Sequence, residues 1–454
     1  MTLWEFIKKR MLQNKTQSIG ENETKMSFDD AAVFAEILAR DLRGYRCCAI
    51  LCQSEMASSL ALLACFAAGV TAVPLSMRYG KAHCQSILET ISPEAILTDT
   101  NGLHVLKLEG SQYEAPPSHP ALIMCTSGTT GRPKGAMLSE RNVMTNINDI
   151  ASYFDLAPQD TILISRPLYH CAVLTGEFLT ALIKGANIRF YSEKFNPTEM
   201  LSLIEKHKVT AFCGTPTLLS LMARLSKNRP MKGLRHIVIS GECMSKEVGL
   251  RIADVFPQTH IYHVYGLTEA CPRVSYLPPE LFRQYPDCVG LPLPSVSLKI
   301  LDDKGEECPP GKEGILFVNG RNIMLGYYRD PRKTSEILKD GWLRTGDIAT
   351  YNDVGLLQIK GRSDDLIIKA GMNIYPAEVE ATLKTDPRVK EVLVYGFDGR
   401  LGKELGMKLV GDFRDTKEIK ELCIKLLPPF EIPTAIELLQ ELPKNGSGKL
   451  LRRR

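Results

Sequence analysis

A segment rich in glycine and hydroxyl side chains is the first part of the sequence that suggests chemistry. It reads Thr126-Ser127-Gly128-Thr129-Thr130-Gly131-Arg132-Pro133-Lys134-Gly135 and directly follows an apolar run. Glycines let a backbone approach a polyphosphate closely, hydroxyl groups donate to its oxygens, and Lys134 adds a mobile positive charge. The segment is not the Walker pattern, because Gly135 follows the lysine where that pattern has Ser or Thr. A phosphate-binding loop is the functional interpretation, and an ordinary flexible turn is the alternative.

Further short segments place polar side chains after apolar runs. They are Pro167-Leu168-Tyr169-His170-Cys171, Ser240-Gly241-Glu242-Cys243, Tyr265-Gly266-Leu267-Thr268-Glu269, Gly341-Trp342-Leu343-Arg344-Thr345-Gly346-Asp347, Gly361-Arg362-Ser363-Asp364 and Pro443-Lys444-Asn445-Gly446-Ser447-Gly448-Lys449. Any one of them alone is an ordinary turn or a solvated tail.

Together these segments resemble the motifs of the adenylate-forming superfamily, which includes acyl-CoA synthetases, aryl-CoA ligases, luciferases and peptide-synthetase adenylation domains. The resemblance covers the chain from about Trp4 to Arg452. It implies that ATP activates a carboxylic acid as an acyl-adenylate with release of pyrophosphate. The acyl group then passes to a pantetheine thiol, either of CoA or of the phosphopantetheine arm of a carrier protein.

The resemblance also implies roles at the nucleotide. Tyr265 would lie against adenine, Thr268 would bond the α-phosphate, and Glu269 would hold Mg²⁺, which prefers oxygen ligands. Asp347 would accept hydrogen bonds from the ribose hydroxyls, because a carboxylate offers two acceptor oxygens. Further nucleotide contacts are expected from Ser240, Gly241, Glu242, His263, Gly266 and Arg362. His263 departs from the family, which commonly has an amide side chain at this position.

Three residues near the C-terminus would serve the two half-reactions. Lys449 would reach both the substrate carboxylate and the α-phosphate and offset the charge that builds up between them. Asp364 would be the hinge residue about which a small domain rotates. Gly371 would then leave room for the thiol arm.

The acid itself is expected beside His170, which occupies the family's gating position. No Asp lies in residues 167–173, so a free α-amino acid is disfavoured. The expected pocket neighbours are small or apolar and suit an aliphatic or aromatic acid: Cys171, Phe212, Gly214, Val264 and Leu267. A second departure is that the region between Thr98 and Ala121 is shorter than is usual for the family.

The elements that must position these residues alternate along the first two thirds of the chain. Short apolar or β-branched runs, such as Thr161–Ile164 and His236–Ile239, alternate with helical patterns, which is typical of parallel βα units. The prediction is an α/β fold with βα-layered parallel sheets and a small β subdomain after about Val296. We predict a large domain at 1–361, a hinge at 362–365 and a small α+β domain at 366–454.

Composition excludes several other classes of protein. Lys and Arg total 56 against 52 Asp and Glu, so the net charge of +4 gives no reason to expect nucleic acid. Thirteen Cys without metal-type pairs indicate free thiols in a reducing cytoplasm. The uncharged stretch Met56–Met77 is interrupted by Gly69 and Pro74, so we predict a buried helix and strand and no membrane span. A monomer or homodimer is expected, and a non-catalytic nucleotide-binding protein is the remaining alternative.

Overall fold

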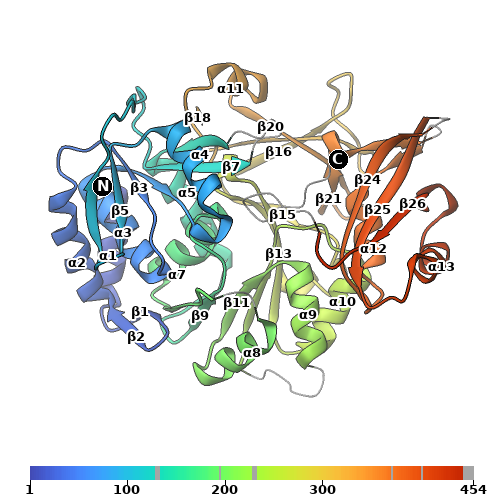
Figure 1. Cartoon of the computed structure of the whole chain (residues 1–454), viewed down its shortest axis with the longest axis horizontal. Helices are drawn as coiled ribbons and strands as arrows, with labels where there is room; N and C mark the ends of the chain where they lie inside the picture. Colours follow the sequence, from blue (N-terminus) through green and yellow to red (C-terminus); the bar gives the residue numbers. More distant parts are fainter. Residues whose placement is uncertain (128–132, 194–195, 227–232, 370–371, 400–401, 443–454) are drawn as a thin grey trace.

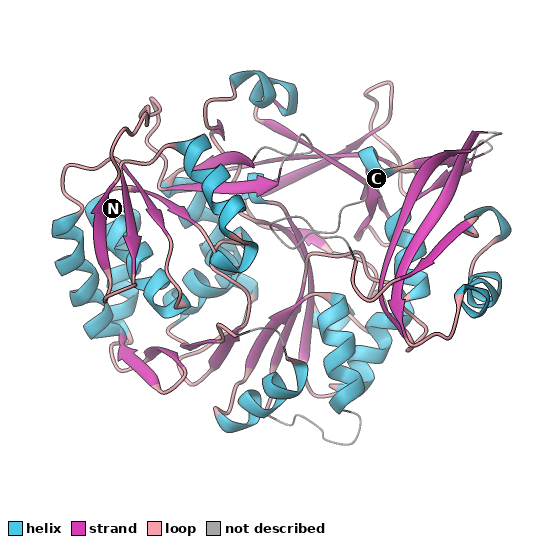
Figure 2. Ribbon diagram, in the orientation of Figure 1, coloured by secondary structure: helices cyan, strands magenta, loops and turns pink. Residues whose placement is uncertain are grey.

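The computed structural model describes residues 1–127, 133–193, 196–226, 233–369, 372–399 and 402–442. Figure 1 shows a large N-terminal body and a smaller C-terminal unit, coloured orange to red, beside it. Helices cover the sheets of the large body (Figure 2). The predicted α/β class, with a β subdomain and a small C-terminal domain, is confirmed.

One mixed sheet carries most of the predicted site segments at its strand ends. Its strand order is β15-β14-β13-β12-β11-β9-β10-β1-β2, and β9 to β13 run parallel to one another. In that order the strands are Leu291–Pro292, Arg273–Leu277, His260–Gly266, His236–Ile239, Ala211–Gly214, Thr161–Ile164, Asn187–Phe190, Ser18–Glu21 and Thr24–Ser27. The carboxyl ends of parallel strands meet at one edge of a sheet, which brings together segments far apart in sequence.

The second sheet of the large body holds the glycine-rich segment. Its order is β18-β8-β7-β4-β3-β5-β6, with strands Gly326–Tyr327, Pro133–Leu138, Leu122–Ser127, Thr71–Pro74, Cys47–Ile50, Ala95–Thr98 and His104–Lys107. The uncharged stretch is divided as predicted into helix α3 (Glu55–Ala68) and strand β4, and Gly69 ends the helix with a φ of 67°. The short region after Thr98 forms the edge strand β6 and a loop.

The β subdomain and the small domain follow in sequence. The subdomain pairs β16 (Val296–Leu301), β17 (Gly314–Gly320), β20 (Trp342–Tyr351) and β19 (Leu338–Lys339), with β21 (Leu357–Arg362) on β20. The small domain has the hairpin β22 (Ile367–Lys369) and β23 (Met372–Ile374), and a sheet of β24 (Val389–Gly399), β25 (Gly402–Gly411) and β26 (Ala435–Leu438). A 3₁₀ turn at Ser363–Asp365 joins the two, so the predicted hinge coincides with a real turn; its bending and the domain limits stay predictions.

The helices pack on these sheets. Those of the large body are α1 Leu3–Gln13, α2 Phe28–Asp41, α3, α4 Lys81–Ile91, α5 Glu140–Tyr153, α6 Cys171–Val173, α7 Thr180–Lys184, α8 Pro197–Lys206, α9 Pro216–Ser226, α10 Lys246–Val255 and α11 Pro331–Ile337, and those of the small domain are α12 Pro376–Leu383 and α13 Thr416–Leu426. A π-helical turn, Leu174–Leu179, joins α6 to α7. Helix α1 buries Leu3, Ile7 and Met11 in the main core, and Thr2 with Glu5 forms a capping box at its start.

We expect Phe178→Ala to destabilise the large body by about 3–5 kcal/mol, because a fully buried ring would leave a cavity. Phe178 is 0% exposed, and its ring centroid lies 5.9 Å from that of Phe190. Urea unfolding measures the change. Val33→Ala, on the exposed face of α2, is the control and should stay within about 0.5 kcal/mol of the parent. An equal effect of both changes would contradict the assignment of Phe178 to the core.

Candidate active site

Two neighbouring strands flank the glycine-rich segment. Strand β7 ends with Thr126 and Ser127, and β8 begins at Pro133 and carries Lys134 as its second residue. The residues Gly128, Thr129, Thr130 and Gly131 lie outside the described residues. The Lys134 ammonium lies 5.6 Å from the centroid of the Tyr327 ring. Burial, followed by the charge of Lys333, lowers the pKa of Lys134.

Tyr327 connects this lysine to the nucleotide motif. Strand β18 pairs antiparallel with β8, which places Tyr327 opposite Ala136. Its hydroxyl donates to Glu269 Oε1 at 2.6 Å. Lys134 and Glu269, which sequence reasoning assigned separately to phosphate and metal, therefore both lie beside the Tyr327 side chain. One ammonium and one carboxylate facing the same space suit a magnesium-bound polyphosphate.

The motif itself is held by a close backbone contact. Strand β13 ends at Gly266, and β14 returns antiparallel beside it. A Cβ on Gly266 would lie 2.1 Å from the Pro272 carbonyl oxygen, so only glycine fits. The Leu267 amide donates to that same oxygen at 2.8 Å. Thr268 and Glu269 then begin a 3₁₀ turn, which leaves both side chains partly exposed.

The opposite end of the motif meets the predicted ribose carboxylate. The Tyr265 hydroxyl donates to Asp347, and Arg362 donates to Asp347 Oδ1 at 3.0 Å and to the Thr345 carbonyl at 2.8 Å. Burial and the adjacent Asp347 raise the pKa of Tyr265, so its hydroxyl stays protonated as a donor. The structure thus brings Tyr265, Asp347 and Arg362 together, as the resemblance implies for a ribose site; the roles themselves stay predictions.

The loop after β12 contacts the small domain. Ser240 is buried and Gly241 has a φ of 92°. Glu242 Oε2 accepts from Thr217 at 2.5 Å and lies 3.3 Å from Lys384 Nζ, at the end of α12. Burial opposes ionisation of Glu242, but Lys384 and Thr217 outweigh it and the pKa of this carboxyl is lowered.

His263 lies below this surface. Its side chain is 2% exposed, and its Nδ1 lies 2.9 Å from the Pro286 carbonyl oxygen. Burial lowers the pKa of His263 to about 4. His263 could therefore affect nucleotide binding only indirectly, through the backbone segment around Pro286 that it contacts. The direct contact with the nucleotide stays a prediction.

The predicted acid pocket divides into two faces. Cys171 and Val264 belong to the main core, whereas Phe212 packs among Leu219, Met222 and other residues on the other side of its strand. Gly214 leaves room for Leu219, since a Cβ would lie 3.1 Å from Leu219 Cγ. Leu267 packs against the β subdomain core.

His170 comes immediately before helix α6 and is partly buried. Burial first, and then the charges of Arg166 and Arg78, lower the pKa of His170 to about 3. The ring is therefore neutral throughout the physiological range. A neutral ring suits a steric gate better than a proton carrier.

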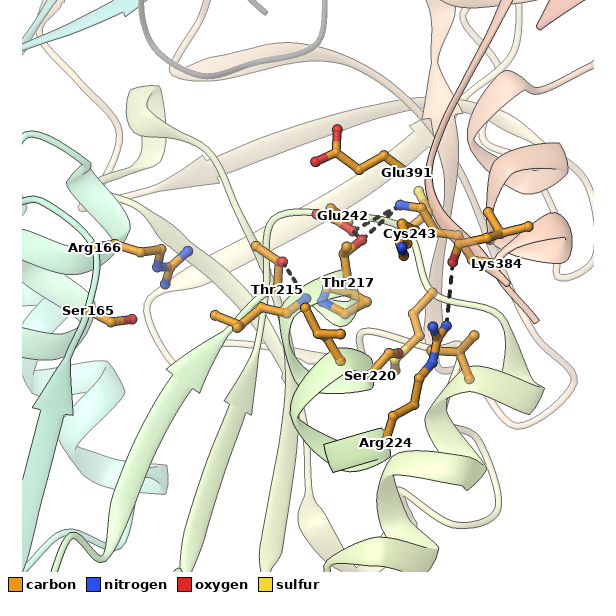
Figure 3. A pocket seen from close by; sticks show the side chains of 18 of the residues that line it. Ser165, Arg166, Thr215, Thr217, Ser220, Arg224, Glu242, Cys243, Lys384 and Glu391 are labelled. Atoms are coloured by element: carbon orange, nitrogen blue, oxygen red, sulfur yellow. Dashed lines mark hydrogen bonds and ion pairs between the residues drawn. The ribbon is translucent and has the colours of Figure 1, made fainter. Parts of the chain in front are cut away.

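A cavity of about 930 Å³ opens between the large body and the small domain. Arg166 and Thr215 line it at the strand ends, Glu242 and Cys243 line the loop side, and Lys384 closes it from the small domain (Figure 3). A volume of this size accommodates a drug-sized ligand.

Some predicted residues are placed elsewhere or not described. Lys449 and Gly371 lie outside the described residues, and Asp364 is exposed on the hinge turn. Two neighbours of the site, Tyr327 and Lys384, were missed. Each reaches the site from a distant element by tertiary pairing, and neither carries a local sequence signal.

The residues present fit a magnesium–nucleotide complex. Within the described ranges no group of three or more His, Cys, Asp and Glu could enclose a metal ion. Glu269 lies beside Lys134, which matches the habit of Mg²⁺ to use one or two carboxylates together with substrate phosphates. Over the same residues, no helix is long and apolar enough to cross a membrane.

Family models match both parts of the chain. The model described as AMP-binding enzyme matches residues 14–328, and that described as AMP-binding enzyme C-terminal domain matches residues 378–449. The chain therefore belongs to the AMP-binding enzyme family. These matches and the fold define it as an AMP-forming acid–thiol ligase of the acyl-CoA synthetase type.

Three similar proteins illustrate the relationship. The chain is 32% identical over 419 residues to a feruloyl-CoA synthase of an Amycolatopsis species, covering 86% of this chain and 84% of that one. It is 32% identical over 434 residues to the 2-succinylbenzoate–CoA ligase of Bacillus licheniformis, covering 89% and 88%. The structure of O-succinylbenzoate CoA synthetase from Bacillus subtilis with ATP and magnesium ion superposes with a TM-score of 0.86 at 28% identity, covering 100% of this chain and 98% of that one.

We expect His263 to make stability depend on pH. The buried ring stays neutral down to its pKa of about 4, whereas in the unfolded chain it takes up a proton below about 6.5. The unfolded state then binds more protons, so the free energy of unfolding falls as pH drops from about 6.5 to 4, by up to about 1.4 kcal/mol per pH unit. Denaturant unfolding at a series of pH values across this range gives the number of protons taken up on unfolding. That number should be smaller by up to one in His263→Gln than in the parent. The exposed His119→Gln is the control, and an unchanged slope in His263→Gln would contradict the burial argument.

Proposed function

We propose that this chain binds ATP across the segment Tyr265–Glu269, activates a carboxylic acid as its adenylate and transfers the acyl group to CoA. The observation that carries the assignment of roles is that one five-residue segment contacts the expected ribose residues at one end and the expected phosphate and metal residues at the other. Tyr265 meets Asp347 and Arg362 at one end, and Glu269 meets Tyr327 beside Lys134 at the other.

The chemistry assigned to the protein is positioning and charge neutralisation. The acid oxygen attacks the α-phosphorus of ATP and pyrophosphate leaves, so two anions must first be held together. Mg²⁺, when bound, neutralises phosphate charge and orients the leaving group. Thr268 donates to the α-phosphate, Lys134 pairs with the departing phosphates, and Asp347 fixes the ribose.

Lys449→Ala should lower acid-dependent pyrophosphate exchange by about 100-fold or more, because the cation that offsets the meeting anions is lost. Transfer from a chemically made acyl-adenylate to CoA should remain close to that of the parent. Lys417→Ala, on the start of α13 in the same domain, is the matched control. Undiminished exchange in Lys449→Ala would disprove the role of this lysine.

The small domain is held against the large one by contacts at the end of α12. Lys384 Nζ donates to Thr217 at 2.9 Å beside Glu242, and Arg251 donates to the Thr385 carbonyl at 2.6 Å. Arg224 donates to the Pro387 carbonyl at 2.5 Å. The likeness to the complex with ATP and magnesium extends over the whole chain and supports assigning this arrangement to adenylation. Rotation to a thioester-forming state has to break these bonds.

Lys384→Ala should therefore slow adenylation more than thioester formation. The pair with Glu242 is partly buried, with the two side chains 20% and 32% exposed, and its loss is expected to cost about 1 kcal/mol, or about fivefold in the adenylation rate. Single-turnover measurements of both half-reactions test this. Lys403→Ala removes a solvent-exposed ion pair with Asp398 inside the small domain and serves as the control. Equal losses in both half-reactions would contradict the assignment.

The acceptor is CoA in this proposal, since the matched relatives are named CoA ligases. A carrier-protein phosphopantetheine presents the same thiol. Offering both acceptors to the enzyme with an activated acid distinguishes them. If a thioester forms on the carrier protein and none forms on CoA, the carrier protein is the acceptor and this part of the proposal is wrong.

A further inference from the structure

A buried cluster of charged side chains lies under the strand ends beside His170. Glu177, in the π-helical turn Leu174–Leu179, is 1% exposed, and Arg273, at the start of β14, is 3% exposed. Arg166, just beyond the end of β9, donates to Glu177 Oε1 at 2.6 Å. The apolar pocket that the sequence predicts includes none of these three charged residues.

Arg273 is fixed against the π-helical turn. Its backbone exchanges hydrogen bonds with the Asn146 side chain at 2.8 and 3.2 Å. A Cβ on Gly176 would lie 2.8 Å from Arg273 Nη2, so the glycine makes room for the guanidinium. The guanidinium charge also acts on the Tyr153 hydroxyl and opposes the rise of its pKa on burial. The guanidinium is thus built into the structure and is not a solvated side chain that happens to fold inward.

The cluster carries more positive than negative charge. Two guanidinium groups, Arg166 and Arg273, act on one carboxyl, Glu177, and the same three groups act on the Cys213 thiol. Burial raises the pKa of Glu177. Whether Glu177 is ionised or protonated, the two guanidinium groups leave the cluster with an excess of positive charge. Among the described residues, Glu177 Oε2 and Arg273 Nε have no hydrogen-bond partner. Buried charge of this kind is costly unless an anion or a polar group completes it.

The position of the cluster connects it to the acid. Arg273 is the strand neighbour of Gly266 in the nucleotide motif, and Arg166 acts on the His170 ring. Arg166 also lines the cavity of about 930 Å³, into which its side chain extends in Figure 3. The cluster therefore lies beside both the nucleotide motif and His170, where the acid is expected.

We propose that Arg166 and Arg273, which both act on Glu177, form a cationic wall of the acid pocket that selects an acid carrying a second carboxylate. This inference rests on the proposed function. It replaces the expectation of a purely aliphatic or aromatic acid by a dicarboxylic acid, whose second group pairs with the guanidinium groups while the first is adenylated. Arg166 and Arg273 are then specificity-determining residues.

The test compares three matched series of acids by pyrophosphate release: α,ω-dicarboxylates of increasing length, monocarboxylates of the same length, and the half-methyl esters of the dicarboxylates. At the optimal length the dicarboxylate should exceed both neutral-ended acids in kcat/KM by at least about tenfold, because a site built for a polar group discriminates against analogues that leave it unpaired. Efficiency for the monocarboxylate equal to or above that for the dicarboxylate would overturn the inference.

Charge-altering variants separate specificity from folding. Arg166→Gln should lower the ratio of dicarboxylate to monocarboxylate kcat/KM by about tenfold, whereas Arg166→Lys should keep most of it. Glu177→Gln removes the competing negative charge and should raise the ratio. Opposite responses of the two glutamine variants are not expected of a merely structural ion pair, and a fall of the ratio in both would overturn the inference.

Arg235→Gln is the matched control. Arg235 pairs with the buried Asp160 at 2.9 Å, at the opposite ends of the same parallel strands, and the change should leave the ratio unaltered. Thermal unfolding with and without ATP verifies that each variant is folded; if Arg166→Gln does not fold, Arg166→Lys and Glu177→Gln carry the comparison. No pyrophosphate release with any acid would refute the proposed function itself, whereas release without preference refutes only this inference.

Discussion

The close approach of two backbones at Gly266 and Pro272 is the constraint on which the site depends. Because no side chain intervenes there, β14 can turn back directly beside β13. That turn aims Tyr265 at the β subdomain, where Asp347 lies, and aims Glu269 at the second sheet, where Tyr327 and Lys134 lie. A substitution at Gly266 would push β14 away and separate the ends of the site.

Much of the fold was predictable because its signals are local. Strands such as Thr161–Ile164 and His236–Ile239 are continuous apolar runs with clear ends, and the structure reproduces them. The division of the uncharged stretch at Gly69 was predictable for the same reason, since glycine in the left-handed region commonly ends a helix. These decisions need only a few neighbouring residues.

The contacts within the site were less predictable because they join distant segments. Tyr327 reaches Glu269 only because β18 pairs with β8, and Lys384 reaches Glu242 only because the small domain lies against α9 and α10. The two faces of a buried strand are also indistinguishable in a continuous apolar run. Phe212 and Cys213 both read as buried, yet Phe212 packs under the helices while Cys213 faces Glu177 and the two arginines.

The same reasoning explains why an apolar pocket was the natural expectation from sequence. Arg166, Glu177 and Arg273 are spread over more than a hundred residues, and a charged residue after a strand usually points to solvent. Only the fold closes the π-helical turn over the strand ends and buries Glu177 and Arg273, with the Arg166 side chain 22% exposed beside them. An apolar replacement of similar size would fill that volume without the cost of desolvating charges. Keeping two guanidinium groups and one carboxyl there is therefore unfavourable for stability alone, and it becomes favourable once a second anion enters the site and offsets the excess positive charge.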